Sequence, residues 1–140
     1  MVRTSVVLAC SMLLGVSNLV AQQTQGYPLV LRADAPIYPP LARMARITGK
    51  IAAKFTVVRG EVASTEIGLG HPLLVKATNE NIKSWHFSPE VTGIFMTTFD
   101  YRLEGRETAT MQNPRTVMWL PESVRIVAAP TSPPGEAGRR

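Results

Sequence analysis

The sequence is poor in the residue types that build disulfides, metal centres and catalytic sites. Among its 140 residues it has one cysteine, Cys10, and two histidines, His71 and His86. A disulfide needs a pair of cysteines, and a zinc site needs several cysteine, histidine or carboxylate ligands at suitable spacing. A hydrolase needs a nucleophile beside a base, and no Gly-x-Ser-x-Gly elbow occurs. We therefore predict that the protein is not an enzyme and holds no metal or cofactor.

Both histidines have an ordinary structural interpretation. His71 stands in a turn immediately before Pro72. His86 follows Trp85 at the expected end of a helix, where a polar or cationic tip suits the helix dipole. We expect neither side chain to act as a catalytic base.

Charge of one sign is also not concentrated anywhere in the chain. The formal net charge is +5, from 15 basic and 10 acidic residues. No basic run interleaved with aromatic residues occurs, which argues against a nucleic-acid partner. We predict a mildly cationic surface and no small-molecule substrate. The scattered basic residues are Arg43, Arg46, Lys50, Lys54, Lys76, Lys83, Arg139 and Arg140.

A hydrophobic run suited to targeting stands at the N-terminus. Arg3 precedes an apolar stretch from Val6 to Val16, and Leu19-Val20-Ala21 offers a small residue for cleavage. A membrane-spanning helix needs about 20 apolar residues, and Ser17-Asn18 ends this run earlier. We predict a cleaved signal peptide over residues 1–21. The alternative is an uncleaved inner-membrane anchor.

The pattern from Pro39 to Val58 predicts a short helix followed by a strand. Pro39 and Pro40 begin the helix, because proline fits the first turn, where its missing N–H has no helical partner. Thr48-Gly49 ends it. Apolar and polar residues then alternate from Lys50 to Val58, which indicates a strand with one buried face.

A hairpin, a second helix and a third strand are expected next. Arg59-Gly60 separates the first strand from a second one over Val62 to Leu69. Pro72 begins the helix, and the third strand runs from Ile94 to Leu103. Asn81 lies in the apolar stripe of the helix and should find a hydrogen-bond partner, because burying an unpaired amide costs about 1–3 kcal/mol. The stripe also holds Leu74, Ala77, Thr78, Ile82 and Trp85, of which Trp85 is expected in the core.

This arrangement resembles the C-terminal domain of TonB-type energy transducers. The family carries Tyr-Pro, Ala-Arg, Gly, Gly-x-x-x-Leu and Trp-x-Phe-x-Pro motifs in that order, followed by a last strand. The matching segments here are Tyr38-Pro39, Ala42-Arg43, Gly49, Gly70 to Leu74, Trp85 to Pro89 and Phe99 to Leu103. Their shared order and spacing over about half of the chain carry the resemblance.

The resemblance implies a periplasmic protein-interaction module. TonB-type domains bind a short extended segment of outer-membrane transporters and pass on force from an inner-membrane motor. We therefore expect binding to a peptide of an outer-membrane TonB-dependent receptor, in energy-coupled transport. The alternative is a soluble periplasmic adaptor or structural protein without energy transduction, because neither a convincing anchor nor a long proline-rich spacer is evident. The sequence also leaves open whether the protein forms a homodimer.

The expected fold class is α+β. We predict a small three-stranded antiparallel sheet with Lys50–Val58 in its centre and two helices on one face. The chain divides into a signal peptide (1–21), an N-terminal arm (22–36), a TonB C-terminal-like domain (37–105), an extension with two short strands (106–129) and a disordered tail (130–140).

The third strand is the expected partner-binding edge. As a border strand it would offer unpaired backbone groups to an extended peptide. The candidate residues are Ile94, Met96, Thr98, Asp100 and Arg102. The apolar runs Thr116–Leu120 and Ser123–Val127 would be costly to leave in water, so we expect one of them to pair with this strand and cover the edge.

Overall fold

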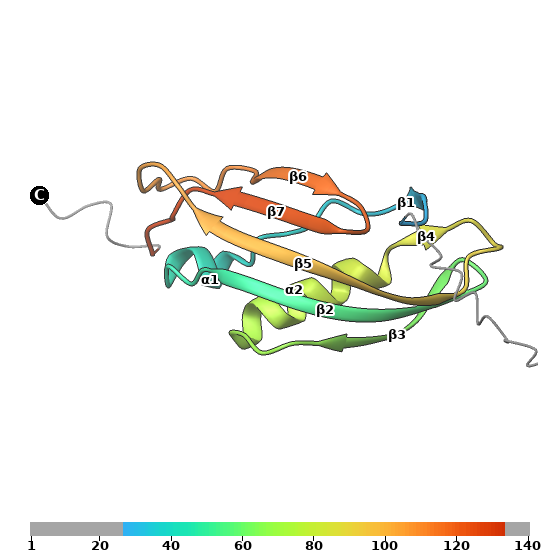
Figure 1. The fold of residues 1–140 in the computed structure, drawn as a ribbon. Helices are drawn as coiled ribbons and strands as arrows, with labels where there is room; N and C mark the ends of the chain where they lie inside the picture. Colours follow the sequence, from blue (N-terminus) through green and yellow to red (C-terminus); the bar gives the residue numbers. More distant parts are fainter. Residues whose placement is uncertain (1–26, 134–140) are drawn as a thin grey trace, which may run out of the picture.

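The computed structural model describes residues 27–133, in which two helices pack against one face of a curled seven-stranded sheet (Figure 1). The strand order is β1-β4-β3-β2-β5-β7-β6. The strands are β1 (Val30–Arg32), β2 (Gly49–Val58), β3 (Glu61–Ile67), β4 (His86–Phe87), β5 (Gly93–Leu103), β6 (Arg115–Trp119) and β7 (Ser123–Ala128). The helices are α1 (Pro40–Met44) and α2 (Pro72–Lys83). Residues 1–26 and 134–140, including the predicted signal peptide, lie outside the described residues.

The predicted α+β class and the central position of β2 are confirmed, but the prediction of a three-stranded sheet is wrong. The expected strands form the antiparallel centre, β3-β2-β5. On one side β4 and β1 extend the sheet, with lengths of two and three residues that are too short to show a period of two. On the other side β7 and β6 extend it, because the C-terminal hairpin joins this sheet.

The turn between β2 and β3 explains why β4 lies where it does. Gly60 has φ +84°, and a Cβ atom there would lie 2.6 Å from the Phe87 carbonyl oxygen. The Phe87 N–H donates to the Gly60 carbonyl at 2.7 Å, and the Gly60 N–H donates to the Val91 carbonyl at 2.9 Å. Glycine therefore lets the segment after α2 approach the turn closely enough to add β4 to the sheet.

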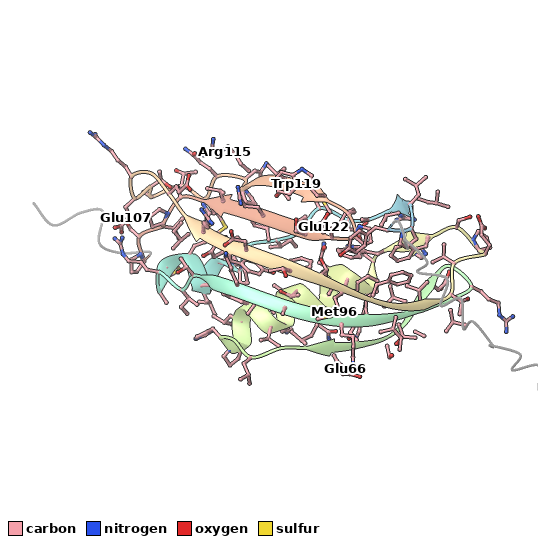
Figure 2. The ribbon with its side chains drawn as sticks, viewed as in Figure 1. Glu66, Met96, Glu107, Arg115, Trp119 and Glu122 are labelled. Carbon is pink, nitrogen blue, oxygen red and sulfur yellow. The ribbon has the colours of Figure 1, made fainter. Side chains whose placement is uncertain are left out.

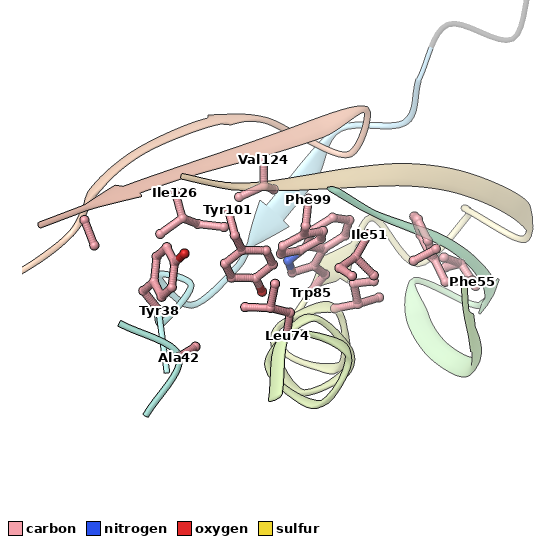
Figure 3. Packing of buried hydrophobic residues seen from close by; sticks show 14 of the residues in the cluster. Tyr38, Ala42, Ile51, Phe55, Leu74, Trp85, Phe99, Tyr101, Val124 and Ile126 are labelled. Carbon is pink, nitrogen blue, oxygen red and sulfur yellow. The ribbon is translucent and has the colours of Figure 1, made fainter. Parts of the chain in front are cut away.

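The core lies between the helices and the inner face of the sheet (Figure 3). Trp85 is fully buried, and its ring centroid lies 5.4 Å from that of Phe55 and 6.0 Å from that of Phe99. The alternating residues of β2 supply the sheet side of this core, as the sequence pattern predicts: Ile51, Ala53, Phe55 and Val57.

Asn81 has the partners that its buried position requires. Its Nδ2 donates to the Asp34 carbonyl at 2.9 Å, and its Oδ1 accepts from Trp85 Nε1 at 3.1 Å. The amide thereby joins the N-terminal arm, α2 and the central tryptophan. This outcome confirms the prediction of a hydrogen-bonded amide in the apolar stripe.

The C-terminal extension is built into the domain. Strand β7 pairs in parallel with β5 and contributes Val124, Ile126 and Ala128 to the core. After β7 the chain continues along Thr108, which forms a parallel bridge with the buried Thr131. The predicted disorder is therefore wrong for residues 130–133, where backbone pairing and burial order the chain.

Candidate functional site

The outer edge of β5 is covered over only part of its length. Strand β7 pairs with Thr98 to Leu103, so Gly93 to Thr97 has a strand neighbour, β2, on one side only among the described residues. We call Gly93 to Thr97 the uncovered segment of β5. Figure 1 shows β5 extending past the turn between β6 and β7.

Backbone parity decides which groups of the uncovered segment face outward. The Thr98 N–H donates to the Glu122 carbonyl at 3.2 Å, so Thr98 directs its backbone groups toward β7. Residues two apart along a strand direct these groups to the same side. The N–H and C=O groups of Ile94 and Met96 therefore point to the open edge.

The five candidate edge residues thus fall into two groups. Thr98, Asp100 and Arg102 pair with β7, and Asp100 also interacts with the Arg102 Nε at 2.8 Å and the Arg125 Nε at 3.6 Å. Ile94 and Met96 lie beyond β7, and their side chains are 65% and 62% exposed. Met96 lies on the face of the sheet opposite the helices (Figure 2).

The boundary between covered and uncovered edge is fixed by Glu122. Its carbonyl accepts from the Thr98 N–H and from the Thr97 hydroxyl, both at 3.2 Å. Its own N–H donates to the Trp119 carbonyl at 2.8 Å, which closes the turn from β6 to β7. Because this turn ends the cover at Thr98, about five residues, or roughly 17 Å of strand, stay open.

Arg43 holds the extension in place, which the sequence did not indicate. The prediction of a solvated surface charge is wrong here, because Arg43 is 2% exposed. Its Nε donates to the Ala129 carbonyl at 3.0 Å, and its Nη1 donates to the Gln112 carbonyl at 2.7 Å. A fork of several N–H donors suits this bridging of two carbonyls from separate segments. The guanidinium joins α1 to the chain on both sides of the C-terminal hairpin.

The histidines occupy separate structural positions. His71 caps α2, and its Nδ1 accepts from the Leu73 N–H at 3.2 Å. His86 lies in β4 with its Nδ1 3.6 Å from Glu61 Oε1. Within residues 27–133 no three His, Cys, Asp or Glu side chains gather in a way that could hold a metal ion. In the same residues no helix is long and apolar enough to cross a bilayer.

The fold and this edge define a class of protein, a small α+β module with a partly open sheet edge. Residues 34–103, half of the chain, match the family described as Gram-negative bacterial TonB protein C-terminal, and the chain belongs to this family. The family is a non-enzymatic, periplasmic interaction domain that engages outer-membrane TonB-dependent receptors. The search of curated proteins returned no match. Both β6 and β7 lie beyond the matched residues.

Proposed function

We propose that this protein works in the periplasm and binds an extended peptide of an outer-membrane TonB-dependent receptor along the uncovered segment of β5, in energy-coupled transport. The observation that carries the proposal is the open edge of Gly93 to Thr97 in a domain of this family. A peptide there would pair with the outward N–H and C=O groups of Ile94 and Met96. It would continue the line of β7 past Glu122.

Docking a peptide at the uncovered segment of β5 costs less free energy than docking it in place of β7. Freeing the rest of the edge would expose Val124 and Ile126, which are fully buried. Re-exposing a side chain of this size costs about 1.5–3 kcal/mol, before the loss of the Arg43 hydrogen bonds is counted. Binding at Gly93 to Thr97 requires none of this. A short receptor peptide can therefore dock without unfolding the extension.

The alternative function is a periplasmic adaptor that keeps the fold without transducing energy. The cover of Thr98 to Leu103 by β7 supports it, because a shortened edge offers fewer backbone hydrogen bonds to a peptide under load. N-terminal sequencing of the protein recovered from cells separates the two. A chain that begins at Gln22 favours the adaptor, and a retained N-terminal segment favours the transducer.

Proline substitution at Met96 tests the docking edge. The Met96 N–H points outward, so Met96→Pro removes a docking donor and leaves the pairing with β2 intact. We expect a labelled receptor peptide to bind at least roughly tenfold more weakly to Met96→Pro, in fluorescence anisotropy. Met96→Thr, which keeps the N–H, is the matched control and should bind within about twofold of the wild type. Equal affinity of the folded Met96→Pro variant would show that the peptide does not use this edge.

A further inference from the structure

Strand β6 forms the open end of the sheet on the side of the C-terminal hairpin. It pairs with β7 and has no other strand neighbour in the described chain. It also lies beyond residues 34–103, so the family match does not account for it. The exposed edge of β6 is a second row of backbone donors and acceptors, separate from the uncovered segment of β5.

Pairing parity identifies the outward groups of β6. The Glu122 carbonyl and the Ala128 carbonyl accept from Thr98 and Glu104, so the even-numbered residues of this stretch face β5. Ser123 and Arg125 therefore face β6, where their partners are Trp119 and Val117. The N–H and C=O groups of the intervening β6 residues, Thr116 and Met118, point to the open edge.

The open edge of β6 has little of the usual protection against pairing, because Arg115 at its start is its only charged residue. Its sequence, Arg-Thr-Val-Met-Trp, is rich in strand-forming residues, and β6 contains no lysine and no proline. No register shift interrupts its pairing with β7. Val117 and Trp119 are 45% and 51% exposed on the face of the sheet opposite the helices, and Figure 2 marks Trp119 and Arg115 on this strand. An edge of this kind favours a strand partner.

The sequence of β6 is complementary to itself in the antiparallel direction. If a second copy pairs about a two-fold axis at Val117, Thr116 faces Met118 of the second copy as a hydrogen-bonded pair, which matches the outward groups. Arg115 then faces Trp119 of the second copy on the exposed side of the sheet. Trp119 already accepts one guanidinium, because the Arg125 Cζ lies 5.7 Å from its ring centroid. The pairing would therefore place a second guanidinium, that of Arg115, within reach of an aromatic ring that already contacts one.

We propose that β6 is a dimerisation edge, at which a second copy of this chain pairs antiparallel through Arg115 to Trp119. The pairing is isologous and closes on itself, so it yields a dimer and not a fibre. It joins two seven-stranded sheets into one continuous sheet. The side chains of Val117 from the two copies meet at the axis and lose their exposure to water.

Sedimentation velocity on the full chain tests the edge with a matched pair of variants. Thr116→Pro removes an outward N–H and spares the bonds to β7, whereas Thr116→Val keeps the N–H. We expect the wild type and Thr116→Val to dimerise, and Thr116→Pro to raise the dimer dissociation constant at least roughly tenfold. A wild type that stays monomeric up to millimolar concentration would overturn the proposal. So would a folded Thr116→Pro variant that dimerises as well as the wild type.

Disulfide trapping gives an independent measurement that does not depend on proline. Residues opposite each other without mutual hydrogen bonds have Cα atoms about 4.5 Å apart, within the range for a disulfide. In a Cys10→Ser background, Val117→Cys should therefore oxidise rapidly to a covalent dimer. The control is Val58→Cys, an exposed position on β2 away from this edge. Crosslinking of Val117→Cys no faster than that of Val58→Cys would exclude pairing at Val117, whatever the receptor-binding result.

Discussion

At the residue scale, the hydrogen bonds of Asn81 decide how the central tryptophan is held. The indole N–H of Trp85 is buried and donates to the Asn81 side chain, which in turn donates to the Asp34 carbonyl. A buried polar group that loses its partner costs about 1–3 kcal/mol. The amide is therefore a structural connection between the arm and the core, although its position in the helix suggests an apolar residue.

Trp85 is the side chain whose loss should weaken the core most directly. We expect Trp85→Ala to lower the free energy of unfolding by about 3–5 kcal/mol, because it empties a fully buried aromatic site. Urea denaturation measures the change. Leu69→Ala, at a fully exposed leucine, is the control and should stay within about 1 kcal/mol. A change below about 1 kcal/mol for Trp85→Ala would contradict its place in the core.

Two tyrosines should make the fold sensitive to alkali. Burial raises the pKa of Tyr38 and of Tyr101 to about 12, from an ordinary value of 10.0. Between pH 10 and pH 12 the native state therefore keeps protons that the unfolded state has lost. The free energy of unfolding is unaffected by these groups below pH 10 and falls as the pH rises through this window, by up to about 1.4 kcal/mol per pH unit for Tyr101.

A phenylalanine variant can show whether Tyr101 causes the loss of stability at high pH. Tyr101→Phe loses the hydrogen bond with Thr78 and should be less stable at neutral pH, but its stability should fall less steeply above pH 10. Urea denaturation from pH 8 to pH 12 gives the slopes. Identical slopes for the wild type and Tyr101→Phe would show that Tyr101 ionises equally in both states.

At the element scale, the backbone amides on the side of β5 that faces away from β2 fall into two groups. The amides of Thr98, Asp100 and Arg102 face β7, whereas those of Ile94 and Met96 face the open edge. The strand is thus both a central element and an edge. This division follows from where the turn at Glu122 begins β7.

Hydrogen exchange should show this division directly. We expect slow exchange for the Thr98, Asp100 and Arg102 amides and fast exchange for those of Ile94 and Met96, measured by nuclear magnetic resonance. The odd-numbered neighbours bond to β2 and provide an internal control, with slow exchange along the whole strand. Protection of Ile94 and Met96 in the free monomer would mean that another segment covers the edge. Addition of a receptor peptide should then protect these two amides selectively.

At the scale of the whole molecule, the extension and the family domain share one hydrophobic core. Val124 and Ile126 share the core with Trp85 and Tyr101, and Arg43 bonds to the chain before and after the hairpin (Figure 3). The extension thus contributes to stability in addition to covering part of β5.

Truncation after Gly105 tests whether the domain depends on the C-terminal extension for its stability. Loss of Val124 and Ile126 alone should remove about 3–6 kcal/mol of burial free energy. Since small domains are stable by only about 5–15 kcal/mol, we expect the truncated chain to be marginal or unfolded at room temperature, as seen by circular dichroism. The full chain should unfold in a single transition. A truncated chain with undiminished stability would show that the extension is only an edge cover.

The sequence by itself determined the central elements of this protein and its family. The period of two in β2, the proline-initiated helices and the ordered motifs from Tyr38 to Leu103 are local signals, because each depends on neighbours along the chain. The same is true of the need for a partner at Asn81. The prediction that an extension strand pairs with β5 followed from the cost of leaving apolar runs in water.

Only the tertiary structure decided how much of the β5 edge stays open. The length of the cover depends on the register of β7, which is set by the packing of Val124 and Ile126 and by the turn at Glu122. The burial of Arg43 likewise depends on carbonyls 69 and 86 positions away in the chain. Strands β1 and β4 are too short to show a pattern. Long-range contacts of this kind leave no periodic trace in the sequence, because the partners are brought together only when the chain folds.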